Sequence, residues 1–266
     1  MKINSVKTLS AFILAGAAGL SVQAQVQVID PLTGGLGGYT TTAVLDNSLG
    51  AGSGVSFTSS GSGLQANYVG SVAAPEQSLF LSLVSSFSSP FVVGDRLSVN
   101  VSVPASSTQM DFGLAIAATA TPTAAGAGNS YNSRTTFDWA SISIRPSQTA
   151  IRANSSISGT LVTANGVING VNPTTVSQLY IDWVSADVFT LGYIDTSSIG
   201  HVSETITFAP SSTIGTAIGF YGDLRATGAS LGNFTSLTIQ PVPEPSTLVL
   251  GGMSLAGLIA VIRRKK

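Results

Sequence analysis

Aliphatic and polar residues alternate one by one along several short stretches of this chain. Residues 97–103, Leu-Ser-Val-Asn-Val-Ser-Val, place an aliphatic side chain at every second position, and Pro104 ends the run. A period of two is that of a strand with one buried face. The alternation recurs in residues 137–144, 179–184, 188–194, 205–208 and 237–239. No window before residue 246 sustains a 3.6-residue period with helix caps, so the pattern predicts strands.

Composition supports an all-β domain. Ser and Thr together make up 66 of 266 residues, and with 29 Gly and 11 Pro they favour turns and strands over helices. Many short strands predict an antiparallel β-sandwich formed by one domain, residues 25–240. Residues 115–125 could be mistaken for a helix, but their Thr and Pro favour a strand that runs into a loop. Residues 34–63, rich in Gly, Ser and Thr, are expected to form a strand pair with long loops.

Charge is scarce and unevenly placed. Six of the 11 basic residues lie in the first seven and last four positions. The interior holds five arginines and eleven acidic residues, so its formal net charge is about −6. A nucleic-acid partner needs a clustered basic face, so we expect none. The chain has no Cys, which excludes disulfides and thiol chemistry.

The N-terminus has the pattern of a secretory signal peptide. Lys2 and Lys7 precede a 12-residue apolar run, residues 9–20, and small residues follow it. We predict a helical signal peptide over residues 1–24, cut by signal peptidase between Ala24 and Gln25. A membrane anchor is the alternative, but a span needs about 20 apolar residues.

The C-terminal segment, residues 241–266, combines a Pro-rich motif, an apolar run and a basic end. Residues 247–262 are 16 uncharged residues, and Arg-Arg-Lys-Lys follows at 263–266. A helix of that length measures about 24 Å at 1.5 Å per residue. Local thinning of the bilayer and snorkelling of basic side chains can close the gap to about 30 Å. We predict one transmembrane helix over 247–262 with a cytoplasmic basic tail; a buried helix is the alternative.

Val242, Pro243, Glu244 and Pro245, followed by this span and tail, resemble the PEP-CTERM sorting signal of Gram-negative, exopolysaccharide-producing bacteria. The resemblance implies transient single-pass anchoring in the inner membrane and then delivery to the cell surface or extracellular matrix. It also implies processing by exosortase, a membrane-embedded cysteine transpeptidase. The two prolines hold the motif extended and remove two amide donors, and the glutamate offers a charged group for recognition.

The domain itself resembles the concanavalin A-like (LamG-type, jelly-roll) domains of secreted bacterial proteins. The resemblance rests on residues 112–116, 179–183, 189–193, 218–223 and 231–239, and it implies a jelly-roll sandwich.

Enzymatic members of that fold, the laminarinase-like ones, carry a Glu-x-Asp-x-x-Glu strand. Glu76 and Glu204, the only glutamates of the domain, lack such partners. A retaining glycosidase needs two carboxyl groups about 5–5.5 Å apart. Asp182 and Asp187 could meet across a hairpin, although an Asp on a solvent face or turn is commoner. We therefore interpret the domain as non-enzymatic.

We expect a carbohydrate-binding site to be formed by exposed aromatic side chains, because sugar rings stack on aromatic faces. The candidates are Trp139, Trp183, Tyr180, Tyr193 and Tyr221. Each Trp shares the alternation of a neighbouring isoleucine, Ile142 or Ile181, so placement in the core is the competing interpretation.

No cofactor is expected. His201 follows Gly200 and precedes a strand, which predicts a position at a loop edge. Calcium is the alternative, because oxygen ligands from loops suffice for it. Asp195 and Asp223 are its candidate ligands, with Thr196, but they lack ordered DxDxDG spacing.

Three hypotheses follow. The first is a non-enzymatic exported protein of the cell surface or biofilm matrix that binds exopolysaccharide. The second is a secreted carbohydrate-active enzyme. The third is a self-assembling structural protein, since strands almost without lysine leave their edges open to strand addition.

Overall fold

The computed structural model describes residues 26–35, 38–45, 54–69, 77–83, 91–103, 110–118, 137–210, 213–224 and 230–242. Residues Val26–Val242 form one compact unit. The predicted signal peptide, its cleavage site at Ala24 and Gln25, and the tail from Pro243 onward lie outside the described residues. Within the described ranges, no helix is long and apolar enough to cross a membrane.

The compact unit consists of two antiparallel sheets. Sheet A has the strand order β13-β12-β11-β6-β15-β4-β3, and β1 also pairs with β15. Its strands are β1 (Gln27–Asp30), β3 (Gly54–Ser60), β4 (Gly63–Val69), β6 (Asp95–Ser102), β11 (Val176–Ser185), β12 (Val188–Asp195), β13 (Gly200–Thr207) and β15 (Ser230–Pro241).

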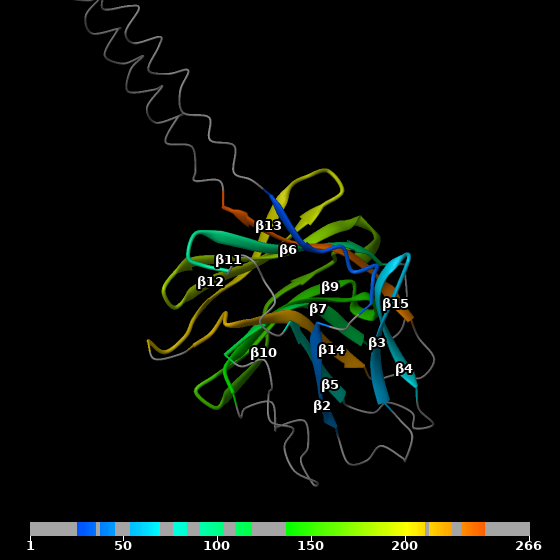
Figure 1. The fold of residues 1–266 in the computed structure, drawn as a ribbon. Helices are drawn as coiled ribbons and strands as arrows, with labels where there is room; N and C mark the ends of the chain where they lie inside the picture. The colour runs from blue at the N-terminus through cyan, green and yellow to red at the C-terminus, as the bar shows by residue number, and fades with distance from the viewer. Residues whose placement is uncertain are drawn as a thin grey trace, which may run out of the picture. The chain divides into compact units, whose positions relative to one another are not determined.

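Sheet B has the strand order β10-β9-β8-β7-β14-β5-β2. Its strands are β2 (Tyr39–Leu45), β5 (Gln77–Leu83), β7 (Met110–Ala117), β8 (Trp139–Arg145), β9 (Ala150–Ile157), β10 (Thr160–Asn169) and β14 (Ala217–Leu224). Two short 3-10 turns, η2 (Pro146–Gln148) and η3 (Pro173–Thr175), connect strands. Figure 1 shows the two layers, with β6, β11 and β12 in one and β7, β9 and β14 in the other.

The core lies between the sheets and follows the predicted alternation. Leu97, Val99 and Val101 of β6 point into it, as do Phe112, Leu114 and Ile116 of β7. Burying a side chain of this size is worth about 1.5–3 kcal/mol, so one apolar face on each sheet supplies most of the driving force. The predicted all-β antiparallel sandwich is confirmed.

The N-terminal prediction needs one correction. Residues 34–63 do form two strands, but β2 lies in sheet B beside β5, and β3 lies in sheet A beside β4. Nearness in sequence suggested a pair. The structure instead places the two strands in different sheets.

Strand β15 joins both ends of the unit. It pairs with β6 on one side, and with β1 and β4 along the other. The register shifts between Thr235 and Thr238. There Ser236 adopts a positive φ of 55° and donates its amide to the carbonyl of Pro31 at 3.3 Å.

Candidate functional site

The candidate site is the face of sheet B that points away from sheet A, called the second face of sheet B below. Its floor is made of small residues on β7 and β14. Gly113 pairs with Ser143 on one side and Tyr221 on the other, and Ala117 pairs with Trp139 and Ala217. A Cβ on Gly113 would come within 1.8 Å of the Ile142 carbonyl oxygen, so only glycine fits there. The floor leaves room for large side chains from the neighbouring strands.

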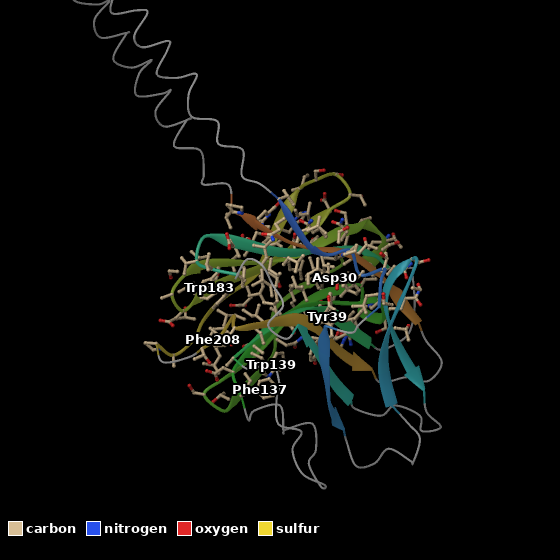
Figure 2. All side chains as sticks on the ribbon, viewed as in Figure 1. Asp30, Tyr39, Phe137, Trp139, Trp183 and Phe208 are labelled. Carbon is tan, nitrogen blue, oxygen red and sulfur yellow. The ribbon has the colours of Figure 1, made fainter. Side chains whose placement is uncertain are left out.

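Two of those large side chains stack on each other. Trp139 of β8 and Tyr221 of β14 lie with ring centroids 5.3 Å apart and planes 19° apart. They form a small apolar cluster with Ala115, Ala117 and Ala217, and Phe137 packs against it (Figure 2). Trp139 is 0% exposed and Tyr221 is 1% exposed. The second face of sheet B therefore carries an apolar cluster separate from the main core.

A buried ion pair lies on the same face. Arg145 at the end of β8 donates from Nε to Oδ1 of Asp111 at 2.6 Å and from Nη2 to Oδ2 of the same carboxylate. A pair at this depth gains Coulomb energy but loses hydration, so removing one partner alone is costly, about 3–5 kcal/mol. Asp223 of β14 lies directly opposite Asp111 in the register. Its side chain is outside the described residues.

Polar side chains continue from this pair across β8 and β9. The set is Ser141, Ser143, Arg152, Asn154 and Ser156. The Ser143 hydroxyl donates to the carbonyl of Arg152 at 3.3 Å. The hydroxyls of Ser141 and Ser156 are fully buried and have no hydrogen-bond partner within the described part of the chain. A buried polar group without a partner costs about 1–3 kcal/mol.

The five aromatic residues predicted as a carbohydrate site do not come together. Only Trp139 and Tyr221 share a face, and neither presents an open ring face, because each is covered. Tyr180, Tyr193 and Trp183 belong to sheet A.

Tyr180 lies on the outer face of sheet A beneath a cation. The Arg96 guanidinium carbon is 3.9 Å from the ring centroid, and the Tyr180 hydroxyl donates to the His201 carbonyl at 3.2 Å. Arg96 also donates to both carboxylate oxygens of Asp182, at 2.6 and 2.8 Å. Burial alone would lower the pKa of Arg96, but the hydrogen bond and charge of Asp182 outweigh it and raise that pKa. Burial raises the pKa of Tyr180. Because Arg96 covers one face of the ring and Tyr180 is buried, the ring is closed to a sugar.

Trp183 is half-buried and packs against the main core. It packs against Phe91 and Phe189 with centroid distances of 5.3 and 5.0 Å, and its Nε1 donates to the Ala186 carbonyl at 3.3 Å. Figure 2 places Trp183 near Phe208, which packs edge-on against Phe189. Neither tryptophan is an exposed platform. Trp183 packs against the main core, whereas Trp139, three positions from Ile142, faces the other way and is buried in the separate cluster on the second face of sheet B.

Tyr193 and His201 stack at one end of sheet A, with ring centroids 4.6 Å apart. His201 lies in strand β13, not in a loop, and its Nε2 is 3.0 Å from Oδ2 of Asp195. Oδ1 of Asp195 accepts the amides of Ser197 and Ile199. The hydrogen bond from His201 and these amides hold the pKa of Asp195 below its usual value.

This geometry does not fit a calcium ligand at Asp195. Both of its oxygens face hydrogen-bond donors, whereas a Ca²⁺ site needs six to eight convergent oxygens. Among the described residues, no three His, Asp or Glu side chains gather in a way that could hold a metal ion. The other candidate, Asp223, has no described side chain.

Of the two hairpin carboxylates, only Asp182 has a hydrogen-bond partner among the described side-chain contacts. Asp182 pairs with Thr190 in the register of β11 and β12 and binds Arg96, while Asp187 lies in the turn that joins the two strands. Asp111 and Arg145 were missed from the sequence, because a charged residue in an alternating strand is normally read as facing solvent. The one signal in the sequence was their position: Asp111 and Arg145 each lie directly beside a stretch in which apolar and small or polar residues alternate.

Comparison with known proteins confirms the C-terminal resemblance: residues 241–265 match the PEP-CTERM protein-sorting motif. This motif marks an exported protein. No curated protein matches the sequence of the chain.

Several solved structures are similar in fold. One is a protein of unknown function from Shewanella oneidensis MR-1, with 14% identity, a TM-score of 0.41, and coverage of 76% of this chain and 77% of that one. Lectin II from Ulex europaeus has 8% identity, a TM-score of 0.44, and coverage of 82% and 97%. A lichenase from a mouse hindgut metagenome has 11% identity, a TM-score of 0.46, and coverage of 82% and 99%. The similar structures thus include a lectin and a glucanase.

Proposed function

We propose that this chain is a non-enzymatic protein that exosortase sorts to the cell surface or extracellular polysaccharide matrix, and that it binds carbohydrate through the second face of sheet B. The proposal rests on two buried hydroxyls, those of Ser141 and Ser156, which have no hydrogen-bond partner among the described residues. They lie on the face that also holds the Trp139–Tyr221 stack.

The chemistry of this face suits a polyhydroxylated ligand. Sugar hydroxyls both donate and accept, so they can satisfy the Ser141 and Ser156 hydroxyls and recover the cost of their burial. The Ser141 and Ser156 hydroxyls are buried, so exposing them to a ligand consumes part of the binding free energy. We therefore expect weak affinity for any single sugar unit.

Binding by glycan array and calorimetry, with the domain of residues 25–242, tests the proposal. Ser141→Ala and Ser156→Ala should each raise the free energy of unfolding by about 1 kcal/mol, because each removes a buried group without a partner, and each should weaken carbohydrate binding. Ser98→Ala is the matched control. Its buried hydroxyl lies 2.7 Å from Thr238 on the outer face of sheet A, so its loss should lower stability and leave binding unchanged. Unchanged binding by both Ser141→Ala and Ser156→Ala would sink the proposed site.

An enzymatic function is the second candidate, and one observation favours it. Asp111 and Asp223 lie directly opposite each other in the register of β7 and β14, and a retaining enzyme uses two carboxyl groups close together. Against it, the Asp111 carboxylate is held by Arg145. Release of reducing ends from matrix polysaccharide, abolished by Asp223→Asn, would favour the enzyme.

A further inference from the structure

The folded unit holds the chain up to the last residue before the Pro-Glu-Pro sequence. Pro241, the last residue of β15, pairs with Asp95 at the start of β6. Val242 then donates its amide to the Gly94 carbonyl at 2.7 Å. Pro243 follows immediately in the sequence. Among the described residues, the bond from Val242 is therefore the backbone hydrogen bond that comes last in the sequence before Pro243.

The turn that receives Val242 is itself firmly built. Asp95 donates its amide to the Val92 carbonyl at 3.0 Å, and its Oδ2 accepts the Val92 amide at 3.1 Å. Gly94 has a φ of +93°, a conformation that favours glycine, and donates its amide to the Trp183 carbonyl at 2.8 Å. We call residues 92–95 together with their bond to Val242 the clasp. It ties the end of β15 to β6 and β11.

A peptide-cleaving enzyme binds its substrate as an extended strand and uses the backbone groups on either side of the bond that it cuts. The amide of Val242 is already engaged by Gly94, and residues 237–241 are paired with β6. An enzyme could use these residues only after the clasp and the end of β15 had separated from β6.

We propose that the clasp bars the sorting enzyme from every peptide bond up to and including the one between Val242 and Pro243, so that the cut falls after Pro243 or later and the released domain keeps all of β15. This inference rests on the sorting step of the proposed function. In the cut, the acyl carbon of a bond beyond Val242 passes to the enzyme's cysteine thiolate, and the amine of the membrane segment leaves with a proton. Water or a matrix nucleophile then releases the acyl group from the thioester.

The test is the intact mass of the released domain after expression of the full chain in a bacterium that contains exosortase. The wild-type product should end at Pro243 or later. Asp95→Ala removes the carboxylate that holds the Val92 amide, and its product should include chains that end at residues 239–242. Asp95→Asn keeps an oxygen acceptor and should restore the wild-type end. Asp138→Ala is the matched control, since Asp138 Oδ1 accepts the Ser158 amide at a distant turn of sheet B.

A second variant does not depend on the stability of the turn. Three glycines inserted between Val242 and Pro243 provide bonds beyond the clasp, and products that end within the insertion should appear. A wild-type product ending at or before Val242 would overturn the inference, as would Asp95→Ala and insertion products cut at the same motif residue as the wild type. Retention of the uncut chain in the membrane would overturn the sorting step and this inference together. Carbohydrate binding by the purified domain would be unaffected by that outcome.

Discussion

Trp139 and Tyr221 stack on each other although a whole strand, β7, lies between the strands that carry them. The rings can meet because β7 presents the small residues Gly113, Ala115 and Ala117 between them. Small residues on the middle strand thus determine where the large residues of its neighbours lie. We therefore expect the packing on the second face of sheet B to be sensitive to larger side chains at these positions of β7.

Gly113→Ala should prevent folding or lower the free energy of unfolding by more than about 4 kcal/mol, because the new methyl group would overlap the Ile142 carbonyl. Expression yield and a urea denaturation curve measure this. Gly200→Ala is the control: no atom lies within 4 Å of a Cβ at that position, so its curve should overlay the wild type. A stable Gly113→Ala domain would contradict the described register of β7 and β8.

The two tryptophans should differ in fluorescence. With Trp183→Phe, the remaining Trp139 is fully buried, so we expect blue-shifted emission and little quenching by acrylamide. With Trp139→Phe, the half-buried Trp183 should be quenched more strongly. Trp139→Ala should cost about 3–5 kcal/mol, as large aromatic truncations in cores do. Equal quenching of the two single-tryptophan proteins would contradict the described burial.

Tyrosine ionisation should be delayed at high pH. Burial, followed by the hydrogen bond donated to Asp30, raises the pKa of Tyr39 far above its usual value, and burial raises the pKa values of Tyr180 and Tyr193. A raised folded-state pKa contributes stability that is complete below the unfolded value, about 10, and is lost as the pH rises toward the folded value.

The domain is a clean system for this measurement, because it has neither Lys nor Cys. Absorbance at the tyrosinate band should show fewer than all six tyrosines ionising before the domain unfolds. Tyr39→Phe should flatten the loss of stability above pH 10. A full titration near pH 10 in the folded domain would refute the prediction.

Acid should weaken the contact between Asp195 and His201. The hydrogen bond from His201, with two backbone amides, lowers the folded-state pKa of Asp195. A lowered pKa contributes stability that is present above the unfolded value, about 3.9, and is lost as the pH falls through the folded value. Asp195→Asn should therefore reduce the fall of Tm between pH 5 and pH 2. His201→Phe keeps a ring on Tyr193 but removes the donor, so it should behave in the same direction.

The sequence was sufficient for the sandwich and insufficient for the site. Alternation of apolar and polar residues identifies a strand and its buried face, as in residues 97–103, because neighbouring side chains of a strand point to opposite faces of the sheet. It does not say which strands pair. Trp139 and Tyr221, or Asp111 and Arg145, meet through a register that depends on the packing of the whole sheet. For the same reason the five aromatics grouped by residue type are distributed over both sheets.

The pairing of β1 with β15 has a mechanical consequence. Gln27 lies opposite Ile239 in antiparallel register, so the chain enters and leaves the sandwich at the same end of sheet A. A pulling force applied between these two ends would load their hydrogen bonds one after another and not all at once. The β1–β15 seam would therefore unzip at low force, while a load between Val242 and a distant point of the sandwich would first have to break the bond to Gly94.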